Sequence, residues 1–318
     1  MGAEMLGLYV LGGAVAAWGL SHLRATQRTR AAEAAFPPEG RFVEVDGTRV
    51  HYVTRGKGPD VVLIHGMSGN LRDMTFSLMD RLAQDYRVTA FDRPGMGYTD
   101  SLHEGGETLV EQATLLMKAS RALGLAQPVV MGQSYGGSVA LAWAVEFPET
   151  LSALVLVASP SHPWDGGMSW LYRINSHRVL GPMAIPFEAA WVPKGYIKKA
   201  IAGVFNPQDM PPGYDAHIGA DLTIRPGALR ANALHRAGLL DQISAQAQRY
   251  SALAMPIELI HGNADDTVPL HIHSEPLATK RPNAHLTVLE GIGHMPHHAR
   301  EGAVVEAVHR AHRRAVRS

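Results

Sequence analysis

Three residues stand at the ends of predicted strands and could together carry out nucleophilic chemistry. Ser134 lies in the stretch GQSYG at 132–136, where an apolar run stops and a helical pattern begins. A serine hydroxyl is a poor nucleophile at neutral pH and needs an adjacent base, which in turn needs an orienting group. His294 and Asp265 could supply both, and the chain presents the three in the order serine, acid, histidine.

The two glycines around Ser134 indicate how tight its turn must be. A serine on a strained strand-to-helix turn points its hydroxyl out of the sheet, and side chains two residues away on either side would collide with the turn. Gly132 and Gly136 remove those side chains. The alternative is that Ser134 only caps the helix that follows, which is a common role for a serine after a strand.

Other residues of the same types compete for the roles of acid and base. Asp266 is adjacent to Asp265, and Asp165 follows an earlier predicted strand, so either could orient the histidine. His261 ends a strand but precedes the acid, which fits the order poorly. The remaining competitors are the neighbours of His294, namely His297 and His298.

Composition excludes several kinds of site. The chain has no cysteine, so it has no disulfide, thiolate metal ligand or cysteine nucleophile. Its 29 basic and 29 acidic residues cancel, which argues against a nucleic-acid partner. The histidine-rich stretches HIHSE and GHMPHHARE have neither the helical i, i+4 spacing nor the carboxylate partner typical of metal sites, so we predict no metal.

The elements that must position these residues follow from the apolar pattern. Short apolar runs ending in Gly, Asp or Ser alternate with helical stretches, which predicts an open, mostly parallel sheet with helices on both faces. After a hairpin turning at Asp46-Gly47, the strand candidates are DVVLIHG, YRVTAFD, PVVMGQS, LSALVLVAS, PIELIHG and HLTVLEG. No convincing strand occurs over 159–250, so we expect a helical lid insertion there, because a structureless loop of that length is improbable.

The first 35 residues differ from the rest. Residues 5–23 contain no Asp, Glu, Lys or Arg, and as a helix they reach roughly 28 Å, close to the thickness of a hydrocarbon core. We therefore expect 1–35 to be a membrane anchor with a basic joint and 36–318 to be the catalytic domain. Arg24, Arg28 and Arg30 follow the apolar segment, which places that domain on the cytoplasmic side. A surface-lying or internally docked helix is the alternative.

Several motifs together resemble the α/β-hydrolase fold superfamily, in its serine esterase or lipase-like branch. They are GQSYG at 132–136, HGMSG at 65–69, DRPGMGYTDS at 92–101, HGNADDTVP at 261–269 and GIGHMP at 291–296. The resemblance implies a nucleophile elbow at Ser134, an acid at Asp265 and a base at His294. It also implies an oxyanion hole formed by the backbone N–H groups of Met67 and Tyr135, whose side chains are then free to shape the pocket.

The resemblance also assigns a structural role to the loop that begins at Asp92. In this superfamily the loop braces the active site, and we expect Arg93 to pair with a carboxylate there. Nothing before Arg41 belongs to the hydrolase pattern. Removal of residues 1–35 is therefore expected to leave catalysis intact.

The implied activity is hydrolysis of a small apolar ester through an acyl-enzyme, without a cofactor. Two alternatives remain open: a hydrolase of carbon–carbon bonds in aromatic ring-cleavage products, and a binding protein without catalysis. The first would require basic lid groups, for which Arg173, Arg178 and Arg225 are available. An apolar acyl pocket would instead use the aromatic residues of the insertion, which are Trp164, Trp170, Tyr172, Phe187, Trp191, Tyr196 and Phe205. The oligomeric state does not follow from the sequence.

Overall fold

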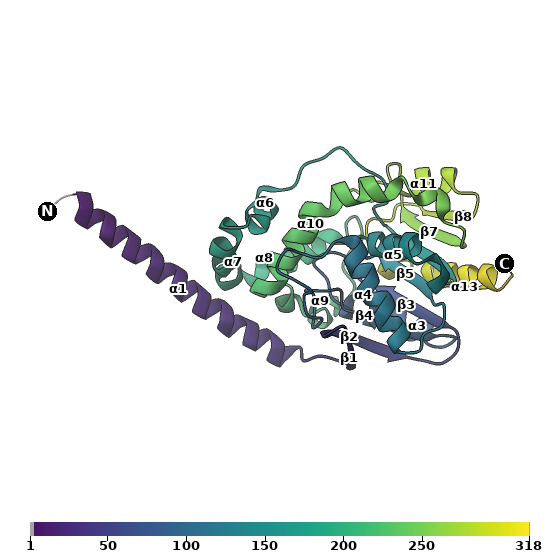
Figure 1. Ribbon diagram of the computed structural model, residues 1–318, viewed down its shortest axis with the longest axis horizontal. Helices are drawn as coiled ribbons and strands as arrows, with labels where there is room; N and C mark the ends of the chain where they lie inside the picture. The colour runs from purple at the N-terminus through teal and green to yellow at the C-terminus, as the bar shows by residue number, and fades with distance from the viewer. Residues whose placement is uncertain (1–2, 318) are drawn as a thin grey trace.

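A single sheet of eight strands organises residues 3–317, the part of the chain that the computed structural model describes (Figure 1). The strands are β1 (Arg41–Val45), β2 (Thr48–Arg55), β3 (Asp60–Ile64), β4 (Arg87–Phe91), β5 (Val129–Gln133), β6 (Ala153–Val157), β7 (Ile257–Gly262) and β8 (Ala284–Leu289). Their order across the sheet is β1-β2-β4-β3-β5-β6-β7-β8. Strands β3 to β8 run parallel to one another, and β2 pairs antiparallel with both β1 and β4, so the predicted mostly parallel sheet is confirmed.

The antiparallel hairpin turns at Asp46 and Gly47. Their φ angles are +51° and +81°, and two successive positive φ values match the right-handed twist of the flanking strands. Aspartate tolerates this conformation better than most residues, and glycine adopts it without strain. The Asp-Gly pair thus sets the register of β1 against β2.

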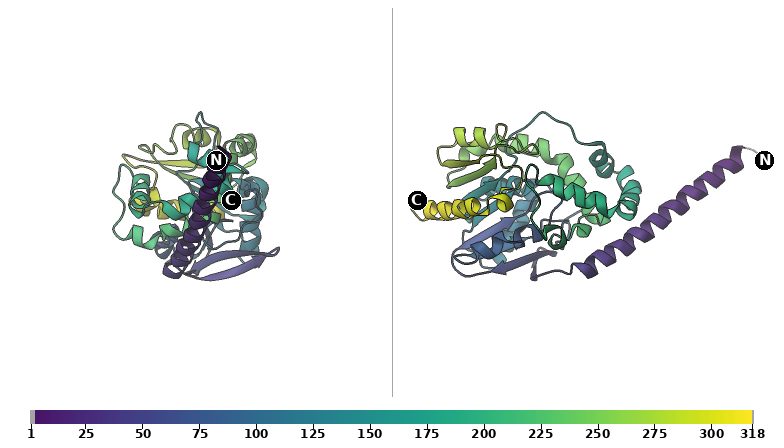
Figure 2. Two further views of the ribbon diagram at one scale, coloured as in Figure 1. Left: turned by 90° about the vertical axis from the view of Figure 1, so that its left-hand side faces the viewer. Right: turned by 180° about the vertical axis from the view of Figure 1, so that it is seen from behind.

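Helices cover both faces of the sheet (Figure 2). α4 (Leu109–Ala122) and α5 (Tyr135–Glu146) pack on one face, whereas α3 (Leu78–Leu82) and α13 (Glu301–Arg317) pack on the other. Three shorter helices lie beside the strand ends: α2 (Arg72–Thr75), α11 (Ser274–Lys280) and α12 (Pro296–Ala299). All residues of β5, β6 and β7 are buried, as expected for parallel strands that are covered on both sides.

Between β6 and β7 the described chain forms helices and no strand. They are α6 (Trp170–Ser176), α7 (Leu180–Trp191), α8 (Lys194–Val204), α9 (Tyr214–His217) and α10 (Pro226–Ala247). α10 begins with Pro226, whose fixed φ suits the first turn of a helix. It packs against α6 and α7 at one end and reaches α5 at the other, which joins the insertion to the sheet.

The first helix, α1 (Ala3–Ala35), projects from the rest of the molecule (Figure 1). Every residue from 4 to 20 is exposed. Among the described residues, this is the one helix long and apolar enough to cross a membrane, judged by length and composition. It runs without a break through the apolar segment 5–23 and the basic joint that follows.

The second half of α1 is docked on α7. Arg24 Nε donates to the carbonyl oxygen of Ala190 at 3.0 Å, and Arg28 donates to the carbonyl oxygens of Ala190 and Val192 at 3.2 and 3.0 Å. These carbonyls lie at the C-terminal end of α7, where the last carbonyls of a helix lack intrahelical partners. Ser21 accepts a further hydrogen bond from Trp191 Nε1 at 2.9 Å. Two arginines expected in the basic joint therefore cap a helix of the insertion.

This docking predicts how removal of the N-terminus affects stability. Deletion of residues 1–20 should leave the thermal unfolding temperature unchanged, because residues 4–20 are exposed. Deletion of residues 1–35 should lower it, because the three hydrogen bonds from Arg24 and Arg28 are lost, each contributing about 1 kcal/mol. Thermal unfolding of both truncated chains in one buffer checks this. Equal unfolding temperatures would show that the docked half contributes nothing.

Candidate active site

Ser134 occupies the sharp turn between β5 and α5. Its φ and ψ are +50° and −124°, a backbone conformation that residues other than glycine rarely adopt. A Cβ at Gly132 would lie 2.2 Å from the carbonyl oxygen of Gly136, and one at Gly136 would lie 2.3 Å from that of Ile64. Both positions therefore exclude any side chain, and the N-terminus of α5 packs directly against β3.

His294 connects Ser134 to Asp265. His294 Nε2 lies 2.9 Å from Ser134 Oγ, and His294 Nδ1 lies 2.8 Å from Asp265 Oδ2. With Nδ1 donating its proton to the carboxylate, Nε2 is left as an acceptor facing the serine hydroxyl. All three side chains are buried, and they come from three separate strand ends, after β5, β7 and β8. The structure thus brings together the three residues selected from the sequence.

The surroundings of Asp265 keep its carboxylate ionised. Its Oδ1 accepts hydrogen bonds from the backbone N–H groups of Thr267 and Val268, both at 2.9 Å, and His261 Nε2 lies 3.3 Å from Oδ2. Burial acts to raise the pKa of Asp265, but the hydrogen bonds from His261 and His294 and the charge on His294 outweigh it. Together they hold this pKa well below its usual range.

The competing acids and bases lie elsewhere. Asp165 and Asp266 are exposed, and Asp265 is the carboxylate that contacts His294. His297 and His298 turn toward Asp73 instead of Ser134. His261, by contrast, contacts the acid, so it helps to hold the carboxylate.

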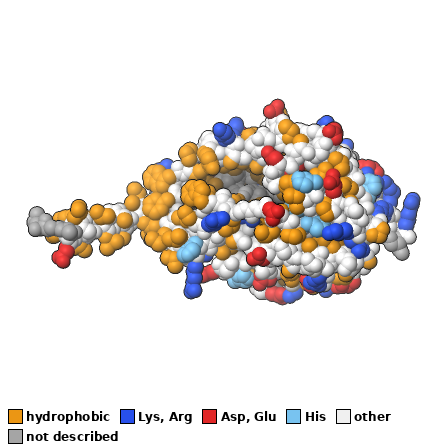
Figure 3. Space-filling view, turned by 90° about the horizontal axis from the view of Figure 1, so that it is seen from above, with side chains coloured by type: hydrophobic (Ala, Val, Ile, Leu, Met, Phe, Trp, Pro, Cys, Tyr) orange, Lys and Arg blue, Asp and Glu red, His pale blue; other side chains and the backbone are white. Residues whose placement is uncertain are grey.

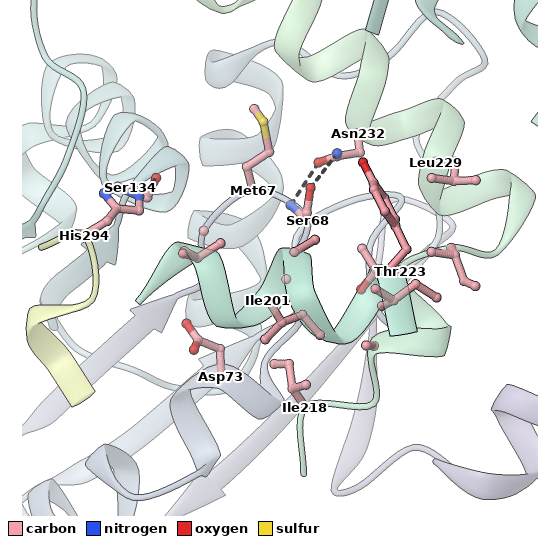
Figure 4. Close-up of a pocket in the computed structure, with 18 of the residues that line it drawn as sticks. Met67, Ser68, Asp73, Ser134, Ile201, Ile218, Thr223, Leu229, Asn232 and His294 are labelled. Carbon is pink, nitrogen blue, oxygen red and sulfur yellow. Dashed lines mark hydrogen bonds between the residues drawn. The ribbon is translucent and has the colours of Figure 1, made fainter. Parts of the chain in front are cut away.

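The loop after β3 passes beside the serine. A Cβ on Gly66 would lie 3.3 Å from Ser134 Cβ, and Met67 lines the same cavity as Ser134 and His294 (Figure 4). Tyr135 begins α5, so its backbone N–H is one of the unpaired groups at a helix N-terminus. The two backbone groups expected to form an oxyanion hole therefore flank Ser134, and their role stays a prediction.

The side chain of Tyr135 does not shape the pocket, contrary to the sequence-based expectation. It is buried on the far side of the turn, where its hydroxyl accepts a hydrogen bond from Gln112 Nε2 at 3.0 Å and its ring stacks on His235. Burial raises the pKa of Tyr135 to about 12. Because α5 turns away from the cavity immediately after Ser134, only Met67 of the two residues contributes its side chain to the lining.

Arg93 braces the loop through carbonyl groups, whereas the sequence suggested a carboxylate partner. Its Nε and Nη2 donate to the carbonyl oxygens of His65 and Gly66 at 3.1 and 3.0 Å, and its Nη1 donates to Gln112 Oε1 at 3.0 Å. The guanidinium lies over the ring of Tyr135 at 4.4 Å. Burial lowers the pKa of Arg93 to about 10, which leaves it charged at neutral pH. The guanidinium of Arg93 therefore fixes His65 and Gly66, the residues just before Met67.

Asn232 on α10 ties the insertion to the same loop, which no sequence motif indicated. Its Oδ1 accepts a hydrogen bond from the Ser68 N–H at 3.0 Å, and its Nδ2 donates to Ser68 Oγ at 2.8 Å (Figure 4). The same amide donates to the Tyr172 hydroxyl at 3.2 Å. A buried amide held in this way fixes the positions of α6 and α10 over the loop.

A second buried polar cluster lies at the edge of the cavity. The Asp73 carboxylate accepts hydrogen bonds from His297 Nε2 at 3.1 Å, His298 Nε2 at 2.8 Å and the Tyr214 hydroxyl at 2.7 Å. Burial raises the pKa of Asp73, but the two histidines outweigh this effect and hold it well below its usual range. The cluster joins α2, α9 and α12.

The same cluster bears on the predicted absence of a metal. The sequence showed no carboxylate partner for His297 and His298, and the fold supplies one in Asp73 from a distant segment. The three ligand atoms lie within 4.8 Å of one another, so these are the residues that could hold a metal. The Asp73 carboxylate accepts three hydrogen bonds, whereas the Nδ1 atoms of His297 and His298 are buried without a hydrogen-bond partner among the described residues, and the absence of a metal stays a prediction.

Ser134 and His294 open into a cavity of ≈ 490 Å³ beneath the insertion. Its lining includes the side chains of Asp73, Glu188 and His294, and no Lys or Arg among the described residues. Three of the seven aromatic residues expected to roof a pocket line it, namely Tyr172, Tyr196 and Phe205. Trp164 packs beside His273, and the other three, Trp170, Phe187 and Trp191, are exposed instead.

Known proteins resemble this chain in sequence. The family model described as alpha/beta hydrolase fold matches residues 59–169. A dihydrolipoyllysine-residue acetyltransferase component of the acetoin cleaving system from Cupriavidus necator is 39% identical over 119 residues, which are 37% of this chain and 31% of that protein. The 2-hydroxymuconate semialdehyde hydrolase of Pseudomonas putida is 28% identical over 81% of this chain and 88% of its own length.

Solved structures share the fold. A thermophilic esterase from Thermogutta terrifontis superposes with a TM-score of 0.67 at 21% identity, covering 87% of this chain and 99% of its own. A membrane phospholipase A, described as a bacterial virulence factor, superposes with a TM-score of 0.62 at 22% identity and covers 96% of this chain and 98% of its own. By its sheet, by the family model that matches residues 59–169 and by the solved structures that superpose on it, this chain has the α/β-hydrolase fold.

Proposed function

We propose that the protein is a serine hydrolase that cleaves carboxylic ester bonds of small apolar substrates. The observation that carries the proposal is the position of His294, which lies within hydrogen-bond distance of both Ser134 and Asp265. Such an arrangement activates a hydroxyl that would otherwise be a poor nucleophile. The esterase structure with the same fold supports this proposal.

The proposed reaction has two halves. Ser134 Oγ attacks the ester carbonyl while His294 Nε2 takes the hydroxyl proton and then passes it to the leaving alcohol. The ionised Asp265 stabilises the imidazolium that forms between these transfers. The N–H groups of Met67 and Tyr135 donate to the oxyanion of each tetrahedral intermediate. Water, activated by His294, then hydrolyses the acyl-enzyme, so no cofactor takes part.

The cavity supports an apolar ester over a ring-cleavage product as substrate. A hydrolase of anionic ring-cleavage products needs cations in its pocket, and the P. putida relative suggests that reaction by name. Arg173 and Arg178 are exposed on the outside of the insertion, and Arg225 binds Glu33 at 2.8 Å. The carboxylates that do line the cavity, Asp73 and Glu188, would repel an anion.

We also propose that residues 5–23 of α1 anchor the protein in a membrane, with the hydrolase domain on the cytoplasmic side. The exposure of residues 4–20 supports an anchor over an internally docked helix, since only the second half of α1 contacts the domain. The positive-inside rule supports the sidedness, because the arginines follow the apolar segment. The membrane phospholipase A that covers 96% of this chain is consistent with such an arrangement.

Replacing the proposed catalytic residues tests the assignment. Ser134→Ala and His294→Ala should each lower kcat for p-nitrophenyl butyrate by about four to six orders of magnitude, because the residues act as a unit. Asp265→Asn should also be severe, since it changes the tautomer and orientation of His294. Asp266→Asn is the matched control, and its rate should equal that of the wild type.

A fluorophosphonate probe separates an enzyme from a binding protein that retains the fold. It labels an activated serine, so it should mark wild-type Ser134 and leave Ser134→Ala unlabelled. Wild-type protein that stays unlabelled, or a fully active His294→Ala variant, would remove the triad assignment.

The rate should fall as the pH is lowered. An imidazolium at His294 cannot accept the serine proton, so acylation slows as the histidine becomes protonated. Asp265 does not contribute to this loss, because its pKa lies well below its usual range and its carboxylate stays ionised. Stopped-flow acylation rates between pH 5 and 8 measure the dependence. A flat profile over that range would argue against a histidine base.

Acyl-chain length should discriminate between the two enzymatic readings. Each methylene buried in the cavity can contribute up to about 0.8 kcal/mol, so kcat/KM should rise from p-nitrophenyl acetate to the butyrate and hexanoate. Ile201→Trp, which fills the lining, should lower the ratio of hexanoate to acetate. Val179→Trp on the outer surface is the matched control and should leave it unchanged.

The opposite result would identify a different substrate class. A ring-cleavage hydrolase would ignore these neutral esters and would hydrolyse a vinylogous 1,5-diketone instead. Its activity would also depend on a lid arginine, so Arg173→Ala, Arg178→Ala and Arg225→Ala would each be assayed on both substrates.

A further inference from the structure

The outer surface of the insertion exposes far more apolar side chains than the rest of the globular body. Among the described residues after position 36, twelve large apolar residues are exposed, and eight of these lie in the segment from Trp170 to Val204. Soluble surfaces rarely gather such residues in one place without a partner. We call six of them, which lie on α6, on α7 and at the N-cap of α7, the outer apolar surface; they are Trp170, Val179, Leu180, Met183, Phe187 and Trp191.

This surface is continuous with the exposed apolar part of α1. Trp191 donates to Ser21 at 2.9 Å and lies under Arg24 at 4.4 Å, so it touches the point where α1 leaves the domain. Trp18 and Leu20, the next exposed large apolar residues toward the N-terminus, are 40% and 58% exposed. Figure 3 shows apolar side chains gathered where α1 meets the body and around the adjacent hollow.

The docking of α1 fixes the orientation of this surface. Because Arg24 and Arg28 cap the end of α7, a bilayer crossed by residues 5–23 would lie against α7 and α6. The net positive charge of residues 170–204 favours contact with a bilayer that contains anionic lipids. Residues 170–204 contain five cationic residues and one acidic residue, Glu188, and cations beside an apolar surface favour anionic headgroups.

The cavity opens at the same region. Tyr196 and Val204 on α8 line the cavity and are also 64% and 40% exposed, so they form part of its rim. We propose that the outer apolar surface rests in the interfacial layer of an anionic lipid bilayer, as a contact separate from the helix that spans it. The rim of the cavity is thereby held at the membrane surface. This proposal rests on the proposed membrane anchoring by α1.

The experiment uses full-length protein, because the chain has no cysteine and single cysteines can be introduced as labelling sites. Met183→Cys and Phe187→Cys report on the outer apolar surface, and neither residue lines the cavity. Val288→Cys and Val316→Cys are matched controls, since they are exposed apolar residues on β8 and α13. Val10→Cys reports on α1 itself. Each variant is labelled with an environment-sensitive fluorophore and reconstituted in phosphatidylcholine–phosphatidylglycerol vesicles.

The measured quantity is fluorescence quenching by phospholipids that carry a nitroxide on the acyl chain. Quenching at 183 and 187 should be several times stronger than at 288 and 316, and it should weaken when phosphatidylglycerol is omitted. Strong quenching at 10 with none at 183 and 187 would leave the anchor intact and overturn the surface contact. Quenching at none of the sites would overturn both.

A second copy of the chain is the competing occupant. It would shield the fluorophores at 183 and 187 from water without exposing them to lipid nitroxides. In addition, Met183→Ser and Phe187→Ser would change the oligomeric state of the protein in detergent. That outcome would overturn the proposal. The readout needs no turnover, so a failed esterase assignment would leave the result interpretable.

Discussion

The backbone of Ser134 is the constraint on which the rest of the site depends. A positive φ at a residue other than glycine costs of order 1–3 kcal/mol and persists only where the surroundings impose it. Here they do so by contact: the start of α5 lies so close to β5 that a Cβ at Gly132 has no room, and so close to β3 that a Cβ at Gly136 has none. Burial of β5 on both faces stabilises this arrangement, and the hydroxyl is thereby held at the edge of the sheet.

Hydrogen bonds from Arg93 and Asn232 fix the loop after β3, which faces the serine. Arg93 is fully buried, yet each of its donor nitrogens has an acceptor, so its charge is not left unsatisfied. Asn232, on α10 of the insertion, forms two hydrogen bonds with Ser68 of the same loop. The loop is therefore held from below by the sheet and from above by α10. A displacement of the insertion would act directly on the proposed oxyanion hole.

The sequence predicted the parts of the structure that local pattern controls. The strand ends, the hairpin at Asp46-Gly47 and the placing of Ser134 follow from apolar runs and turn residues, whose effects act within a few positions. Asn232 and Asp73 carry no such signal, because their partners lie on distant segments and only the fold brings them together. The prediction that Arg93 pairs with a carboxylate was wrong for the same reason, because every residue has a backbone carbonyl and no sequence pattern indicates which of them accepts a hydrogen bond.

The sequence also could not predict which way the side chains of the insertion point. Aromatic residues in a helical segment indicate burial somewhere, but which of them face the cavity depends on how α6, α7 and α8 pack. Tyr196 lines the cavity, whereas Trp170 and Trp191 are directed outward. The proposed membrane contact follows from this difference and could not have been derived from composition.

The attachment of α1 to α7 limits how the insertion can move. Hydrogen bonds from Arg24 and Arg28 end on the last carbonyls of α7, so α7 can leave its position only by breaking them or by moving together with α1. A helix that spans a bilayer tilts but does not leave it, because exposing its apolar residues to water is costly. In the proposed membrane arrangement α7 is fixed in this way, and access to the cavity then changes through α6 and α8. α8 carries the rim residues Tyr196 and Val204, and it has no buried residue, whereas α6 and α7 each have at least one, so packing restrains α8 less than its two neighbours in the insertion.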